Sequence, residues 1–161
     1  LAYKLSGEFD MALECLDKAI FIDPKDIYNY NSKAIILFQR GQLEDAKFVI
    51  EQALLSTPEN HLLLGNLGEI QMREEDFQGA RRTFTKIAKT YPDKSIGHYS
   101  LGNLEVEEGN LGNALLYFNK AETLDKNSWK IKAALASVQQ ELGNVDEAIS
   151  NYEKAIILDP D

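Results

Sequence analysis

Three prolines, Pro24, Pro58 and Pro92, stand 34 residues apart along the chain. The same step gives alanine in five positions out of five: Ala12, Ala46, Ala80, Ala114 and Ala148. It also gives glycine in four positions out of five: Gly7, Gly41, Glu75, Gly109 and Gly143. No insertion or deletion interrupts this register. A fixed period of this length indicates a repeat architecture, in which one small structural unit recurs along the chain.

Apolar residues within each period have the spacing of an α-helix. Ala12, Leu16, Ala19 and Ile20 follow the i, i+4, i+7, i+8 pattern of one buried helix face. On the helix before the next alanine, residues 64, 67, 68 and 71 follow the related i, i+3, i+4, i+7 pattern. Each period is therefore predicted to contain two helices.

Turn and cap residues mark where these helices end. The glycine register predicts a tight turn between the two helices, because glycine accepts the left-handed conformation that ends a helix. Gly7 accordingly predicts that residues 1–26 hold the end of a first helix and a complete second helix. The prolines stop the second helices, and Asp26, Asn60 and Ser128 are candidate N-caps of the helices that follow.

Small residues recur where two helices must approach closely. A second set of positions, counted in steps of 34 residues from Ala19, holds alanine in four positions out of five, with Ile87 as the exception. A larger side chain at such a contact overpacks it, at a cost of roughly 1–3 kcal/mol. We therefore expect a local shift or a wider gap at Ile87. One helix pair cannot bury its own apolar faces, so successive pairs must stack on one another.

This pattern resembles the tetratricopeptide repeat family, whose signature is a 34-residue helix pair. The motif residues are Leu67, Gly68, Ala80, Phe84 and Pro92, echoed by Leu101, Gly102, Ala114 and Phe118. The resemblance covers the whole chain and implies an all-α fold, a right-handed α-solenoid of antiparallel helix pairs. It divides residues 1–161 into a partial repeat, 1–26, and the repeats 27–60, 61–94, 95–128 and 129–161. Because the chain opens within a repeat, we expect it to be a fragment of a longer array.

The net charge and the cysteine content limit which partners and which cellular compartment are expected. The net charge is −9, and both halves of the chain are acidic. Neither nucleic acid nor an anionic membrane is expected as a partner. Cys15 is the only cysteine, so no internal disulfide can form, and its place on an apolar helical stripe predicts a small buried side chain. A reducing, cytoplasmic location fits this cysteine content.

No catalytic or metal-binding constellation emerges, so we expect no enzyme activity, no metal and no cofactor. His61 and His98, the only histidines, lack the partners of a zinc site. Glycines in the segments 65–68 and 102–103 resemble parts of phosphate-binding loops, but packing between helices explains them better. The paired carboxylates at 74–75 and 107–108 are expected to be solvated.

The basic set Arg82, Lys86 and Lys89 lies on one helix face. We interpret it as an ordinary exposed face, with acidic-peptide or phosphate binding as the alternative.

In the family, the first helices of the repeats line a concave groove, and this resemblance implies a set of binding residues. These are Tyr28, Asn31, Ile35, Phe38, Leu62, Asn66, Glu69, Met72, Arg73, Ile96, Tyr99, Asn103 and Val106. Many of them are large and apolar, which favours a protein or peptide ligand with apolar anchors, oriented by Asn66, Asn103 and Arg73. The alternative is that several of them pack between adjacent first helices.

The clamp by which some family members bind a C-terminal carboxylate is not expected. Asn66 matches its middle element, but Asn31 and Ile35 stand where its first pair belongs, and Ile96 and Ser100 where its last pair belongs. Without those cations a terminal carboxylate would have little to hold it.

A non-catalytic interaction scaffold is therefore the favoured function. One alternative is a substrate-recruiting segment of a larger enzyme, such as a glycosyltransferase, and a weaker one is a small-molecule or nucleotide binder. No polar capping helix follows Pro160, which leaves Tyr152 and Ile156 uncovered. We therefore expect end-to-end association through the terminal helices.

Overall fold

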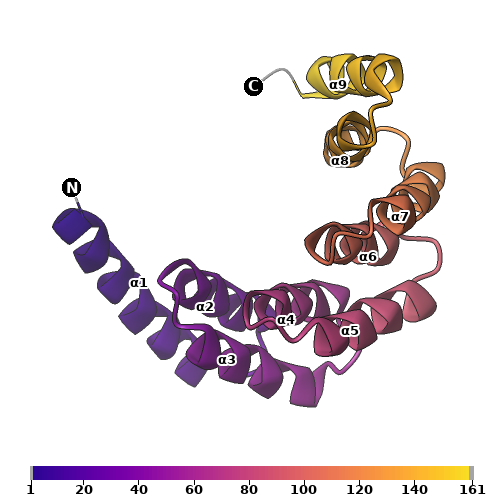
Figure 1. Ribbon diagram of the computed structural model, residues 1–161. Helices are drawn as coiled ribbons and strands as arrows, with labels where there is room; N and C mark the ends of the chain where they lie inside the picture. Colours follow the sequence, from indigo (N-terminus) through magenta and orange to yellow (C-terminus); the bar gives the residue numbers. More distant parts are fainter. Residues whose placement is uncertain (1, 160–161) are drawn as a thin grey trace. The chain divides into compact units, whose positions relative to one another are not determined.

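The computed structural model describes the backbone of residues 2–159 and the side chains of residues 8–159 (Figure 1). This part of the chain is helical throughout its regular structure. The helices are α1 (Ala2–Ile22), α2 (Ile27–Gln39), α3 (Leu43–Ser56), α4 (His61–Arg73), α5 (Phe77–Thr90), α6 (Ile96–Glu107), α7 (Leu111–Leu124), α8 (Trp129–Glu141) and α9 (Val145–Leu158). The predicted all-α helical-repeat fold is confirmed. No helix in the described part is both long enough and apolar enough to cross a membrane.

The helices form two compact units, residues 1–76 with α1 to α4 and residues 77–161 with α5 to α9. In the first unit α2 packs against α1, α3 and α4, and α3 also packs against α4. In the second unit each helix packs against the next, and α6 also contacts α8. Each unit therefore builds its core from consecutive helices, as stacked repeats do.

The alanine registers lie at the centre of these cores. Ala46, Ala80 and Ala114 are fully buried, and Ala148 is 3% exposed. The core of the first unit joins Ala34, Leu37, Ala46, Val49, Ile50, Ala53, Leu63 and Ile70. The core of the second unit includes Ala114, Phe118, Ala121, Ile131, Leu135 and Val138. Ile87 is also fully buried, so its larger side chain is accommodated inside the second unit.

A left-handed residue ends four of the first helices. Gly41, Gly109 and Gly143 have φ angles of 75°, 77° and 82°, and Glu75 in the same register has a φ of 61°. At the first of these turns, the Gln42 N–H donates to the Leu37 carbonyl over 2.9 Å. Equivalent bonds close the other three turns, so the helix C-termini share one hydrogen-bonded motif.

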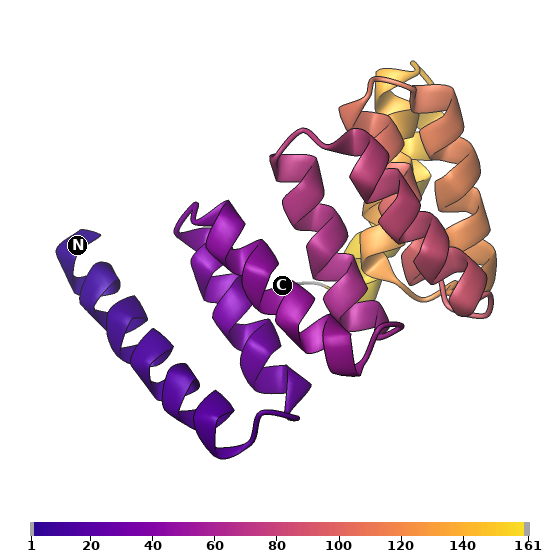
Figure 2. The ribbon, with the colours of Figure 1, turned by 90° about the horizontal axis from the view of Figure 1, so that it is seen from below.

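Two local predictions are wrong. Gly7 does not form a turn, because α1 continues through it as one unbroken helix (Figure 2). Glycine accepts right-handed helix as well as the left-handed turn, and here the helical hydrogen bonds prevail. Cys15 is exposed, because it lies on the solvent side of α1 rather than on its apolar stripe.

All three predicted N-cap residues occupy the N-cap position of the helix that follows. Asp26 accepts from the Tyr28 N–H, and Asn60 accepts from the N–H groups of Leu62 and Leu63. Ser128 precedes α8 as its N-cap, but its side chain makes no cap hydrogen bond.

Candidate functional site

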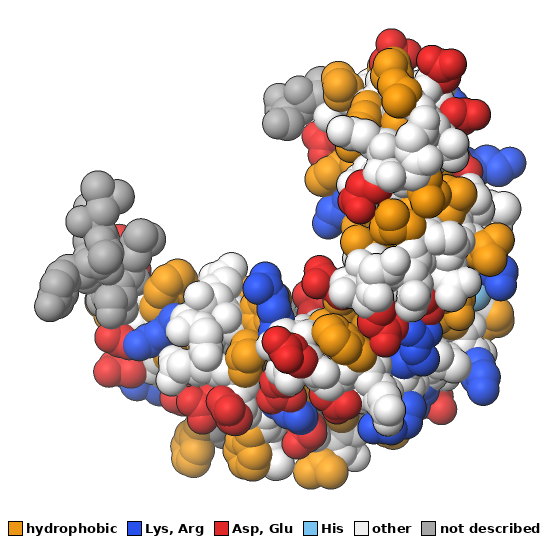
Figure 3. All heavy atoms as spheres, in the orientation of Figure 1, with side chains coloured by type: hydrophobic (Ala, Val, Ile, Leu, Met, Phe, Trp, Pro, Cys, Tyr) orange, Lys and Arg blue, Asp and Glu red, His pale blue; other side chains and the backbone are white. Residues whose placement is uncertain are grey.

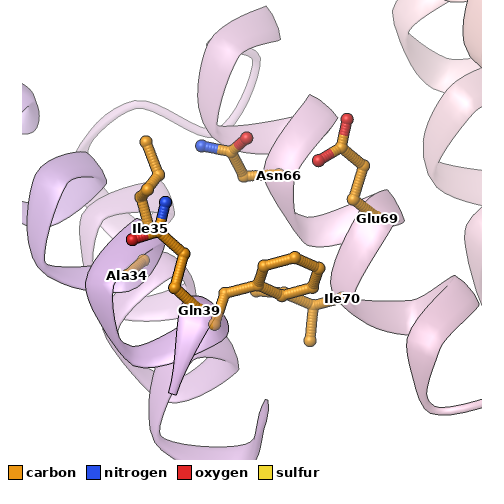
Figure 4. Close-up of a pocket in the computed structure, with 7 residues that line it drawn as sticks. Ala34, Ile35, Gln39, Asn66, Glu69 and Ile70 are labelled. Atoms are coloured by element: carbon orange, nitrogen blue, oxygen red, sulfur yellow. The ribbon is translucent and has the colours of Figure 1, made fainter. Parts of the chain in front are cut away.

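A cavity of about 310 Å³ opens between α2 and α4 in the first unit (Figure 4). Its lining comes from two successive first helices: Ala34, Ile35, Phe38 and Gln39 of α2, and Asn66, Glu69 and Ile70 of α4. Ala34 and Ile70 are each 2% exposed, whereas Ile35 is 40% exposed. The cavity therefore combines buried apolar side chains with an accessible one, and its polar groups are two amides and a carboxylate.

Two asparagines connect the helices beside this cavity. The Asn66 Nδ2 donates to the Asn31 Oδ1 over 2.5 Å. Gly65, next to Asn66, occupies the register of Asn31, and a Cβ built on it would meet nothing within 4 Å. The bare backbone at Gly65 therefore keeps the surface beside the asparagine pair open.

Phe38 lies between this cavity and a second one. The second cavity, of about 500 Å³, is lined by Phe38, Gln39, Gly41, Leu43 and Arg73. The Arg73 guanidinium carbon lies 5.7 Å from the centroid of the Phe38 ring, which places the cation over the aromatic face. One side of Phe38 packs against the core, so the ring is half-buried and shared by both cavities.

The structure brings some of the predicted binding residues together and leaves others apart. Ile35, Phe38, Asn66 and Glu69 surround the first cavity, and Arg73 lines the second. Tyr28 and Leu62, which are 68% and 40% exposed, lie in the first turns of α2 and α4 and line neither cavity. Met72 is half-buried on α4 and lines neither cavity.

Sequence reasoning missed Ala34 and Ile70, which also line the first cavity. Their helical periodicity marks them as core residues, and they are almost fully buried. The only signal that could have found them is their place one helical turn from Phe38 and Asn66.

In the second unit the predicted residues of α6 are half-buried: Ile96, Tyr99, Asn103 and Val106. Tyr99 and Val106 pack against the core of this unit. The Tyr99 ring centroid lies 5.8 Å from that of Phe118, with the two planes inclined by 46°. Much of this face is thus engaged in packing between helices.

Family models of the tetratricopeptide repeat match residues 31–94 and 66–128, and a second model of this repeat matches residues 1–26 and 130–161. The chain belongs to the tetratricopeptide repeat family. Tetratricopeptide repeats act as protein-interaction scaffolds, and this is the general function that membership supports.

Two curated relatives are much longer proteins. Superkiller protein 3 of Schizosaccharomyces pombe is 24% identical over 149 residues, which cover 88% of this chain and 11% of the relative. The RNA polymerase-associated protein CTR9 of Caenorhabditis elegans is 27% identical over 93 residues, which cover 56% of this chain and 8% of the relative. The present chain thus spans about a tenth of the length of these relatives.

Solved structures share the fold. A thermophilic tetratricopeptide repeat protein of Thermus thermophilus, TTC0263, superposes with a TM-score of 0.81 at 20% identity, covering 99% of this chain and 87% of that one. The pilF protein of Pseudomonas aeruginosa gives a TM-score of 0.76 at 22% identity, covering 96% and 71%. A segment of MamA from Desulfovibrio magneticus RS-1 gives 0.70 at 18% identity, covering 96% and 88%.

Glycines inside the first helices of these tetratricopeptide repeats have two different roles. A Cβ on Gly102 would lie 2.4 Å from the Phe118 ring, and Gly68, one period earlier, is buried. Packing explains both, as predicted. The same explanation is wrong for Gly65, whose Cβ position faces open space.

Two of the carboxylates predicted to be solvated form ion pairs. The Lys47 Nζ lies 2.6 Å from the Glu74 Oε2, and Arg81 binds Glu108. Lys47 and Arg81 share one register of the repeat, and Glu74 and Glu108 share another. The hydrogen bond to Glu74 raises the pKa of Lys47. Each pair therefore ties a second helix to the C-terminus of the next first helix.

In the described part of the chain, Nδ1 of the half-buried His98 is the one buried side-chain nitrogen or oxygen atom without a hydrogen-bond partner. Its ring stacks on Tyr117, with centroids 6.3 Å apart and planes inclined by 23°. Burial lowers the pKa of His98, and the positive charge of Lys120 lowers it further. The described residues include no group of three or more His, Cys, Asp or Glu side chains placed to hold a metal ion.

Proposed function

We propose that this tetratricopeptide repeat chain is a non-catalytic scaffold that binds a peptide or partner protein along the first helices. The observation that carries the proposal is the cavity of about 310 Å³ between α2 and α4. Ligand pockets typically range from about 300 to 1,000 Å³, so this cavity suits one or two apolar side chains of a peptide rather than a large cofactor. Its lining lacks a nucleophile paired with a base.

The asparagine pair supplies the polar contacts that orient the peptide. Each side-chain amide has both a donor and an acceptor end. The bond between Asn66 and Asn31 uses one end of each, which leaves the Asn66 carbonyl at the cavity and the Asn31 amino group beside it. A peptide backbone offers the complementary carbonyl and N–H groups. Tyr28 and Leu62 extend the accessible apolar surface beyond the asparagines.

The α6 residues are proposed to make a second set of contacts in the other unit. Ile96, Tyr99, Asn103 and Val106 are half-buried rather than fully buried, so each retains surface for a ligand. Tyr99 and Val106 pack against the core, which fixes their side-chain rotamers and lowers the entropy lost when a ligand binds.

A displayed library of peptides with apolar anchors tests this function. Peptides selected by the wild-type chain should bind Ile35→Asp and Asn66→Ala at least tenfold more weakly, because these variants remove an apolar contact and a polar contact of the cavity. Leu116→Asp is the matched control, since Leu116 is a 62% exposed side chain on α7. Selection of no peptide, or equal binding to all variants, contradicts the proposal.

End-to-end association is proposed to occur through α9. Ile156 is 63% exposed and Tyr152 is 36% exposed, whereas Phe118, in the Tyr152 register of α7, is 1% exposed because α8 covers it. A second copy that stacks on α9 would bury these side chains. Light scattering should show a mass that rises with concentration, and a strictly monomeric chain at high concentration contradicts this association.

A further inference from the structure

The face of α3 that is turned away from α2 and α4 carries two large apolar side chains. Phe48 is 61% exposed and Leu55 is 79% exposed. They are seven residues apart, about two helical turns or 10 Å along one side of the helix. The opposite side of α3 holds the buried Ala46, Ile50 and Ala53. Nothing in the packing of the first unit therefore requires Phe48 or Leu55 to be apolar.

Carboxylates alternate with these apolar side chains. Glu44 precedes Phe48 by four residues, and Glu51 precedes Leu55 by four, so the four residues form one stripe that we name the outer face of α3. Both glutamates are exposed. Lys47 is the only cationic residue of α3, and its ammonium is held 2.6 Å from Glu74. Figure 3 shows hydrophobic and acidic side chains gathered together over α3.

The other second helices do not repeat this pattern. In the registers of Phe48 and Leu55, α5 has Arg82 and Lys89, and α9 has Ser150 and Ile157. In the same registers α7 has Leu116 and Thr123, but without glutamate at the two acidic positions. The acidic positions do recur, as Asp10 and Asp17 in α1 and as Asp146 and Glu153 in α9, but each of those helices has a large apolar residue in only one of the two apolar registers. Among the described helices, α3 alone combines both apolar and both acidic residues.

From this arrangement we infer that the outer face of α3 is a second docking surface, and that its occupant is an amphipathic helical segment of a partner protein. The segment carries apolar side chains spaced by two turns, which cover Phe48 and Leu55, and lysine or arginine beside them, which meet Glu44 and Glu51. The inference goes beyond the proposed function, because this surface belongs to a second helix and not to the cavity between first helices.

Charge complementarity excludes the other occupants. An acidic segment and an anionic lipid surface would both be repelled by the two carboxylates. A second copy of this chain offers one strongly basic helix, α5, but its corresponding stripe is Gln78, Arg82, Thr85 and Lys89. That stripe has no apolar side chain to cover Phe48 or Leu55.

The probe is a synthetic peptide of roughly 18 residues, five helical turns, with Leu and Phe on one face and Lys elsewhere. Three reference peptides accompany it: one with every Lys replaced by Glu, one with the same composition in scrambled order, and one peptide selected for the cavity. Fluorescence anisotropy gives the Kd of each peptide for the wild-type chain and for its variants. The variants are Phe48→Ser with Leu55→Ser, Glu44→Lys with Glu51→Lys, Leu116→Ser as the matched surface control, and Ile35→Asp for the cavity.

The basic peptide should bind the wild type, and the glutamate and scrambled peptides should bind at least tenfold more weakly. Each double variant should weaken binding of the basic peptide at least tenfold, because one removes the apolar contacts and the other reverses the charge. Leu116→Ser and Ile35→Asp should leave that Kd within twofold. All substituted positions on α3 are exposed, so the circular dichroism spectrum should be unchanged. The urea midpoint should fall only slightly, and only in the charge-reversed variant, which replaces the carboxylate of Glu44 in the first turn of α3.

Several results would overturn the inference. One is a Kd for the basic peptide that the α3 variants leave unchanged. Another is binding that Ile35→Asp abolishes, which would place the peptide in the cavity and support the proposed function instead. If the wild type self-associates and the Phe48 and Leu55 variant does not, the occupant is a second copy of this chain. If the wild type binds anionic vesicles and that variant does not, the occupant is a membrane. Failure of the cavity-selected peptide to bind tests the proposed function alone.

Discussion

The guanidinium of Arg81 in α5 donates a hydrogen bond of 2.6 Å to Oε1 of Glu105 in α6, a residue that is only 3% exposed. Arg81 also binds Glu108, and Asn113 of α7 donates to the other carboxylate oxygen of Glu105 over 3.3 Å. Burial alone would raise the pKa of Glu105, but these hydrogen bonds outweigh burial and hold the pKa below its usual value. Glu105 therefore remains charged inside a helix interface because α5 and α7 supply its partners.

Replacing Arg81 should leave a buried carboxylate without its counter-ion. We expect Arg81→Ala to lower the free energy of unfolding by about 3 kcal/mol. This is the lower end of the range for a broken buried ion pair, and we choose it because solvent screens the exposed side of Arg81. Urea titration measures this change. Arg82→Ala is the control, since Arg82 is exposed one residue away, and it should stay within about 0.5 kcal/mol of the wild type. Equal losses in both variants would contradict a special role for the Arg81–Glu105 pair.

Mild acid should destabilise the fold through His98. The folded pKa of His98 lies below its ordinary value of 6.5, because of burial and then the charge of Lys120. Below pH 6.5 the unfolded chain binds more protons than the folded chain, so stability is fully present above this pH and is lost as the pH falls through the window beneath it.

Urea midpoints measured between pH 7.5 and 5.5 (about one unit either side of the ordinary pKa) check this prediction. His98→Phe should flatten the decline, because the aromatic ring still stacks on Tyr117 but cannot titrate. Glu105 does not interfere, since a lowered carboxyl pKa costs stability only as the pH falls below its ordinary value of 4.5. A decline that persists in His98→Phe would exclude this histidine as its cause.

The fold could be predicted from the sequence because the repeat specifies the same contacts several times. An alanine such as Ala80 occurs in every period, and its complete burial shows that close helix contact selects the small side chain. Gly7 shows the limit of this reasoning. The same residue type that makes a left-handed turn at Gly41 continues a helix at residue 7, and only the surrounding packing decides between the two conformations.

The candidate site was less accessible to sequence reasoning. The family resemblance implied that the first helices are neighbours, and it selected Ile35, Phe38 and Asn66, which line one cavity. It did not reveal that a missing side chain at Gly65 opens the adjacent surface, or that Lys47 would pair with Glu74 across 27 residues. Both depend on which side chains meet across two helices, and the periodicity of a single helix does not contain that information.

The turn at Glu75 is a site where the fold can be stabilised. Glu75 has a φ of 61°, a conformation that L-residues adopt at a cost, whereas three other turns in this register use glycine. We expect Glu75→Gly to raise the free energy of unfolding by about 0.5–1 kcal/mol, after allowing for the greater backbone entropy of glycine in the unfolded chain. The urea midpoint should rise accordingly.

Gly41→Ala tests the same turn geometry in the opposite direction. Gly41 has a φ of 75° and open space around its Cβ position, so only backbone conformation opposes the substitution. It should lower stability by about 1 kcal/mol. If both substitutions change stability in the same direction, left-handed strain at Glu75 is not the cause.

Gly102 and Gly65 separate two reasons for glycine within a helix. A Cβ on Gly102 would lie 2.4 Å from the Phe118 ring, and Phe118 is only 1% exposed and cannot move away freely. Gly102→Ala should therefore lower the free energy of unfolding by about 1–3 kcal/mol through overpacking. Gly65→Ala, whose Cβ would meet nothing within 4 Å, should raise it by up to about 1 kcal/mol through the higher helix propensity of alanine. In the double variant Gly102→Ala with Phe118→Leu, the smaller leucine should make room for the alanine Cβ, so the total loss of stability should be less than the sum of the two single losses. Additive losses would show that the two residues do not constrain each other.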